Sequence, residues 1–155
     1  MMRMFLVFML CGLFAAPLAA EEPVHFSDAT LKAVVEDALW VTDPTPTDML
    51  GLTSLSAGSA GISSITGLEY AANLEILSLP CNRITSISAL SGLNNLKKIV
   101  LNNNEINSVS ALSGLSNLEH LDMHDNHQIS SISALSGKSK MYTLILRGNK
   151  VSDIS

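Results

Sequence analysis

Apolar and polar positions recur in a fixed order through the second half of the chain. The segment ITSISALSG at residues 84–92 returns in similar form at 106–114 and at 129–137. The first step is 22 residues and the second is 23, because one residue has been inserted around His127 and Gln128. Aligned outward, four copies share the pattern L-x-x-L-x-L-x-x-N-x-I, which starts at Leu74, Leu96, Leu118 and Met141. A fixed period of this length predicts a solenoid of stacked coils.

The pattern also predicts the shape of each coil. Leu77 and Leu79 are two residues apart, so their side chains lie on the same face of a short strand, and that face is expected to be buried. An Asn after the strand can satisfy backbone groups of a buried turn with its amide. Ile84 and Ile87, spaced by three, predict a tight or 3₁₀ turn that returns to the same core. Stacked coils would align these amides as a structural ladder of Asn82, Asn104, Asn126 and Asn149.

An N-terminal helical cap is predicted ahead of the repeats. Residues 52–68 form a degenerate first copy, in which Ala60 takes the ladder position. Before that copy, apolar residues recur at the spacing of an amphipathic helix, at Leu31, Val34, Val35, Ala38 and Leu39. Ser27 or Asp28 can cap this helix, and the prolines at 44 and 46 exclude its continuation. We therefore expect a cap over residues 21–50, with Trp40 sealing it against the first coil.

The first 20 residues predict a signal peptide. Arg3 precedes an apolar run at residues 4–16, which is shorter than the roughly 20 residues of a membrane-spanning helix. Small residues at 17–20 supply a cleavage zone, so the mature chain is expected to begin near Glu21 and to contain no transmembrane segment. The alternatives are an uncleaved anchor or a buried N-terminal strand. Cleavage would leave Cys81 unpaired, and we expect a buried, inert thiol there.

Composition excludes several function classes. The net charge is -5, and residues 21–48 hold seven acids against the single base Lys32, so no basic patch for nucleic acid is present. The sequence has no G-x-S-x-G elbow, no phosphate-binding glycine loop and no C-x-x-C pair. We therefore expect neither enzymatic activity nor a cofactor.

These features together resemble the internalin type of bacterial leucine-rich-repeat protein. The resemblance covers residues 26–155 and rests on the 22-residue repeats behind a helical cap. It implies a right-handed solenoid with a concave parallel β-sheet, an irregular 3₁₀ convex side, a secreted or cell-envelope location, and protein recognition by the concave face. The sequence departs from the pattern at Ala60, Pro80 and Lys138. About five repeats are expected over residues 51–155, the last one incomplete and without a C-terminal cap.

Strand alternation assigns the candidate binding surface. Residues at odd positions of each strand should project outward while their neighbours are buried. The predicted partner-binding residues are Ile76, Ser78, Lys98, Val100, Asn102, His120, Asp122, His124, Thr143, Ile145 and Arg147. We expect an exported module that binds a protein partner, with a glycan as the other possible ligand. The alternative is a targeting or spacer arm of a larger secreted enzyme or surface-anchored protein whose other domains lie beyond Ser155.

A metal site is the weakest candidate on this surface. His120, Asp122 and His124 share one strand face at steps of about 7 Å, whereas a divalent ion requires ligand atoms about 2 Å away. Adjacent pairs could chelate, but no fourth ligand is evident. We therefore expect a polar recognition patch here rather than a metal centre.

Overall fold

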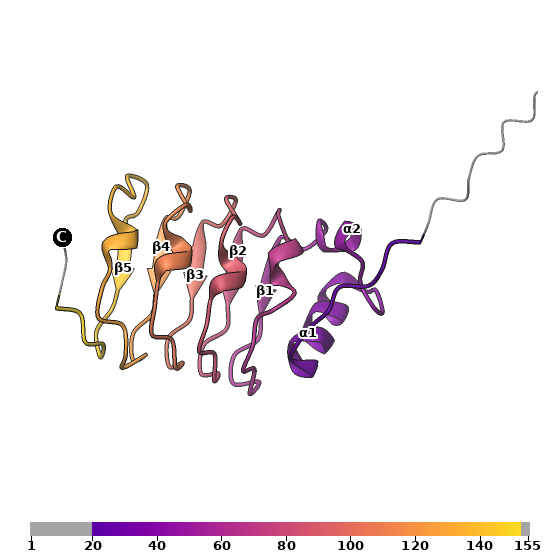
Figure 1. The fold of residues 1–155 in the computed structure, drawn as a ribbon, viewed down its shortest axis with the longest axis horizontal. Coiled ribbons are helices and arrows are strands. Elements are labelled where there is room, and N and C mark those ends of the chain that lie inside the picture. Colours follow the sequence, from indigo (N-terminus) through magenta and orange to yellow (C-terminus); the bar gives the residue numbers. More distant parts are fainter. Residues whose placement is uncertain (1–19, 153–155) are drawn as a thin grey trace, which may run out of the picture.

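The computed structural model describes residues 20–152, so most of the predicted signal peptide lies outside the described residues. Figure 1 shows the coils standing side by side in one row, from the helical cap to the last strand. The chain runs through α1 (Ala29–Leu39), α2 (Pro46–Met49), β1 (Ser54–Ser56), η1 (Leu68–Tyr70), β2 (Ile76–Ser78), η2 (Ser88–Leu90), β3 (Lys98–Val100), η3 (Ser110–Leu112), β4 (His120–Asp122), η4 (Ser133–Leu135) and β5 (Thr143–Ile145). In the described range, no helix is long and apolar enough to cross a membrane.

The strands form one parallel sheet in chain order, from β1 to β5. Leu55, Leu77, Ile99, Leu121 and Leu144 are aligned at its centre. The first four are at most 2% exposed, whereas Leu144 is 42% exposed because the described residues place no further coil against β5. The core therefore runs through the stack as one continuous apolar column.

The opposite wall of the core comes from the 3₁₀ turns. Ile84, Ile87, Leu90 and Leu93 are buried in the second coil, at the spacing that the sequence predicts. Lys138 takes the place of Leu93 two coils later, and its Nζ donates a hydrogen bond of 2.6 Å to the carbonyl of Ser113. The ammonium group thus binds the preceding coil where the other coils bury a leucine.

The ladder asparagines form a buried column beneath the turns that follow the strands. Asn104 Nδ2 donates to the carbonyls of Leu79 and Leu101 at 3.0 and 3.1 Å, and its Oδ1 accepts from the Ile84 amide at 3.0 Å. Ala60 has no polar side chain to bond the turn of the first coil. Asn82 of the second coil bonds that turn instead, since its Oδ1 accepts a hydrogen bond from the Ala60 amide at 3.1 Å. Each ladder side chain therefore fastens two coils together.

A second column of asparagines, not predicted from the sequence, lies just before the strands. Asn73 donates from Nδ2 to the Leu50 carbonyl at the end of the cap, and Asn95 and Asn117 each donate to a carbonyl of the preceding coil, all at 2.8 to 2.9 Å. In the next coil Lys140 replaces the asparagine and donates to Asn117 Oδ1 at 2.7 Å. The Asn-Leu pair that recurs before β2, β3 and β4 was the signal in the sequence for this column.

Asp28 joins the cap helix to the first coil. Its Oδ1 accepts hydrogen bonds from the amides of Thr30 and Leu31 at the start of α1. Its Oδ2 accepts from the amide and hydroxyl of Ser63 at 2.8 and 2.9 Å. Burial opposes the charged form of Asp28, but these hydrogen bonds outweigh it and hold the pKa of the carboxyl below its ordinary value.

Two expectations, about Trp40 and about Cys81, were wrong. Trp40 is 91% exposed and ends α1 in a left-handed conformation, so it does not seal the cap. The buried hydrophobic residues of the cap are Val24, Leu31, Val35 and Met49. The cap helix α1 ends at Leu39, ahead of both prolines, and Pro46 occupies the first turn of the separate helix α2, where its missing amide proton costs nothing.

Cys81 is exposed rather than buried, since its turn carries the side chain outward at a φ of 57°.

Candidate functional site

The outward residues of the sheet form three rows across the five coils. Here they are called the sheet face, and they correspond to the predicted concave surface. The strand register aligns one row of Ser54, Ile76, Lys98, His120 and Thr143, and another of Ser56, Ser78, Val100, Asp122 and Ile145. Backbone bonds between the turns align a third row of Gly58, Pro80, Asn102, His124 and Arg147. The structure thus brings the predicted partner-binding residues together on one surface.

Apolar side chains interrupt this otherwise polar surface. Ile76 is 40% exposed, although its chain neighbour Leu77 is fully buried. Val100 and Ile145 are half-buried in the middle row, on β3 and β5. These two isoleucines and one valine offer apolar area that a partner could bury, at about 25 cal/mol per Å².

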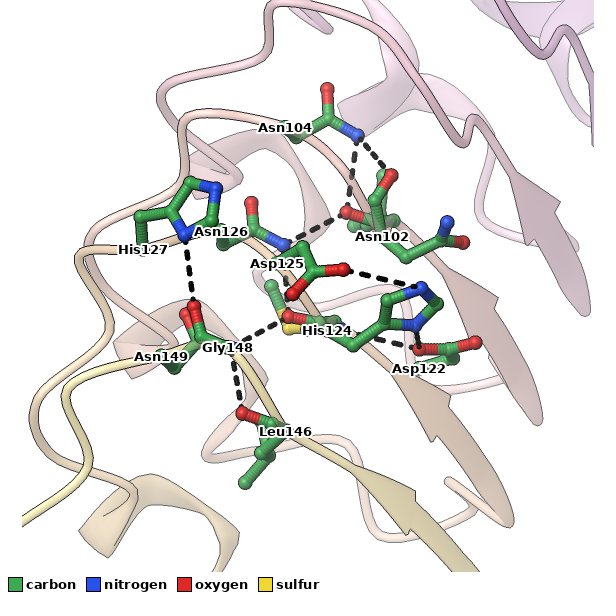
Figure 2. A network of polar contacts seen from close by, with 12 residues as sticks. Asn102, Asn104, Asp122, His124, Asp125, Asn126, His127, Leu146, Gly148 and Asn149 are labelled. Carbon is green, nitrogen blue, oxygen red and sulfur yellow. Dashed lines mark hydrogen bonds and ion pairs between the residues drawn. The ribbon is translucent and has the colours of Figure 1, made fainter.

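Asp122, His124 and Asp125 form a polar cluster at the end of β4, drawn in Figure 2. His124 Nδ1 lies 2.6 Å from Asp122 Oδ1, which also accepts a hydrogen bond from the His124 amide at 3.2 Å. His124 Nε2 lies 3.9 Å from Asp125 Oδ2 on the other side of the ring. The imidazole is therefore held between two carboxylates, which fixes the side chains at this edge of the sheet face.

The weak metal candidate is not assembled. No three His, Cys, Asp or Glu side chains among the described residues are placed to share an ion. Asp122 and His124 meet, but His120 stands one strand step away and does not join them. The arrangement can donate and accept hydrogen bonds with a partner.

A charged rim precedes the strands and was not predicted from the sequence. Lys97 Nζ lies 2.8 Å from Glu75 Oε2, and the Glu75 carboxylate raises the pKa of Lys97 above its ordinary value. Glu119 follows in the next coil, where its amide donates to the Lys97 carbonyl. The signal in the sequence was a charged residue two positions before the buried residue of each of these strands.

A hollow of about 310 Å³ lies on the 3₁₀ side, between the second and third coils. Its hydroxyls come in pairs: Ser86 Oγ lies 3.3 Å from Ser88 Oγ, and Ser108 Oγ donates to Ser110 Oγ at 3.1 Å. Ser86 and Ser108 also accept hydrogen bonds from backbone amides. These hydroxyls therefore stabilise the turns, and the sheet face remains the stronger candidate for binding.

Comparison with known proteins agrees with this architecture. The leucine rich repeat family model matches residues 72–128. An internalin (inlF) structure from Listeria monocytogenes superposes with a TM-score of 0.69 at 30% identity, and internalin C2 (inlC2) from the same organism with 0.78 at 32%. The alignments cover 88% and 89% of this chain. The chain is an internalin-type leucine-rich-repeat protein.

The predicted fold class, a leucine-rich-repeat solenoid with a parallel sheet and a helical cap, is thereby confirmed. This internalin-type chain spans 49% of the inlF structure and 63% of the inlC2 structure. No curated protein sequence matches it significantly. The fold is one that typically serves binding, which directs attention to the sheet face.

Proposed function

We propose that this internalin-type chain is an exported protein-binding module whose sheet face recognises a protein partner. The observation that carries the proposal is that exposed Ile76 and, in the neighbouring row, half-buried Val100 and Ile145 lie on the same face among fixed polar groups. Apolar anchors within a polar surround are the usual composition of a protein interface. Export is supported by the apolar segment at residues 4–16 and the small residues that follow it.

The size of the sheet face limits what it can bind alone. Five strands at about 4.8 Å spacing span roughly 24 Å, so a strip of outward side chains offers on the order of 300 Å². A standard interface covers about 800 Å² on each partner. The turns at the edges of the sheet face must therefore contribute to a stable complex.

The relatives favour a second function for the same surface. Both internalin structures are longer than this chain. A targeting arm within a larger secreted or surface-anchored protein would use the same sheet face to hold that protein at its partner. Reading the gene beyond Ser155 separates the two functions, because only the arm requires a catalytic or anchoring domain there.

The proposal is tested with peptides selected from a random displayed library on the full chain. Val100→Arg places a charged side chain at the middle of the sheet face, and Asn107→Arg makes the same change in charge on the 3₁₀ side of the same coil. We expect Val100→Arg to weaken binding of the selected peptides at least about tenfold, and Asn107→Arg to leave it unchanged. Equal binding by both folded variants, or a library that yields no ligand, would refute the proposal.

A further inference from the structure

The turn after β4 differs from every other turn of the described stack. The register pairs Leu121 with Leu144, a step of 23 residues, whereas the other strands are related by 22. In each coil, one residue before the ladder position has a positive φ; these are Ser59, Cys81, Asn103, Asp125 and Gly148. The turn after β4 has a second one directly after the ladder position, His127, at a φ of 64°; the first coil has a positive φ at the equivalent place, but there the residue is a glycine, Gly61. A side chain with a Cβ adopts this left-handed region at a cost in free energy.

The insertion also breaks the asparagine ladder. The amides of Ile62, Ile84 and Ile106 each donate at 3.0 Å to the Oδ1 of the ladder asparagine in the following coil. Ile129 is next in this series, but the buried Oδ1 of Asn149 accepts no hydrogen bond from any described residue. A buried polar atom left without a partner destabilises the fold. The longer turn therefore carries a second local cost.

The longer turn contacts the next coil: Figure 2 shows the His127 ring beside the carbonyl of Gly148. The His127 amide donates to the Gly148 carbonyl at 3.2 Å, and the ring Nδ1 lies 3.1 Å from the same oxygen. His127 and Gln128 are both exposed, so the insertion fills no core space. The turn lies directly beyond Asp125, at the edge of the sheet face. Local costs of this kind persist where they serve function.

We propose that the His127 turn is a specificity-determining edge of the binding surface, and that it recognises a carboxylate-bearing segment of the protein partner. This inference rests on the proposed function. The carboxylates of Asp122 and Asp125 are half-buried on either side of the His124 ring, whereas the charged side chains that are exposed at this edge are cations. Exposed Arg147 and Lys150 lie with His127 around this turn, in the coil that packs against it. Charge complementarity therefore favours an acidic segment.

The test uses the display-selected peptides with three variants of the full chain. Deletion of His127 restores the 22-residue step, so that Ile129 can donate to Asn149, and it should raise Tm by about 4 °C. The same deletion should weaken peptide binding at least about tenfold. His127→Gly keeps the longer turn but removes the imidazole, and it should also weaken binding. Ser108→Ala, in the hollow on the 3₁₀ side, should leave binding unchanged.

The peptides supply the second arm of the test. We expect them to carry Asp or Glu, and replacing those residues by Asn or Gln should make the wild type and the His127 deletion bind equally. Full binding by the deletion variant, or a fall in its Tm, would overturn the inference. If Val100→Arg then still abolishes binding, the proposed function stands without this edge. If neither Val100→Arg nor the deletion of His127 weakens binding of the peptides, both proposals are refuted.

Discussion

Replacing Asp28 tests how the cap is held on the solenoid. Asp28→Ala removes the cap of α1, worth about 1 kcal/mol, and both hydrogen bonds from Ser63. Hydrogen bonds to a charged group contribute about 1.5 to 3 kcal/mol each. Because Ser63 is exposed to solvent, each of its two hydrogen bonds should contribute no more than the lower value. The total loss in the free energy of unfolding is therefore about 3 kcal/mol.

Asp28→Asn separates the two halves of this interaction. Its amide oxygen can still accept from Thr30 and Leu31, but its NH₂ group would face the N–H and O–H of Ser63. We expect a loss of about 2 kcal/mol, less than for alanine. Asp37→Ala is the matched control, because Asp37 is exposed on the same helix, and it should stay within about 0.5 kcal/mol of the wild type.

Urea unfolding followed by circular dichroism at two pH values measures both effects. The folded pKa of Asp28 lies below its ordinary value of 3.8, so the unfolded chain binds the proton more readily. The contribution of Asp28 is complete above that value and is lost as the pH falls through the lowered pKa. The difference between wild type and Asp28→Asn should therefore shrink when the pH is lowered from 7 to 3. Equal stability of Asp28→Ala and Asp37→Ala at pH 7 would refute the reasoning.

Further predictions concern the ladder and the turns. Asn104→Ala should lower the free energy of unfolding by about 3 kcal/mol in urea titrations, because it strands two carbonyls and an amide inside the stack. Asn95→Ala, in the exposed column, should cost about 1 kcal/mol or less by the same measurement. Cys81→Asn should raise stability by about 0.5 kcal/mol in thermal melts, since Asn adopts the left-handed backbone conformation of residue 81 at a lower cost than Cys. A lower Tm would contradict the idea that Cys81 strains this turn. The exposed Cys81 thiol of the native protein should react with a thiol reagent as fast as a cysteine peptide, and protection until unfolding would contradict its exposure.

The repeating parts of the fold could be predicted because equivalent apolar residues are buried in the same way in each coil. Leu77 and Leu79 are spaced as in a strand, and the equivalent residues recur in each coil. The asparagine that follows them lies where its side-chain amide can hydrogen-bond the backbone of the turn, as Asn82 does with the Leu79 carbonyl. A register is then set for every coil at once, since a shift by one residue would expose the apolar set. The same alternation assigned the outward residues of the sheet face.

The parts that were missed depend on contacts between residues far apart in sequence, or on a single backbone angle. Ser63 becomes the partner of Asp28 only after the cap has packed on the first coil. Trp40 and Cys81 have positive φ angles that carry their side chains into solvent, and hydrophobicity alone gave no sign of this. His120 fails to join His124 because residues four apart along an extended strand are separated by about 13 Å.

The central claim is that the sheet face binds the partner, and methyl NMR tests it most directly. Methyl-labelled full chain is titrated with a display-selected peptide, and the resonances of Ile76, Val100 and Ile145 report on the sheet face. The account predicts that these methyls shift while Ile87 and Val109, buried against the 3₁₀ side, stay unchanged. Shifts confined to Ile87 and Val109, with Ile76 and Val100 unmoved, would contradict it.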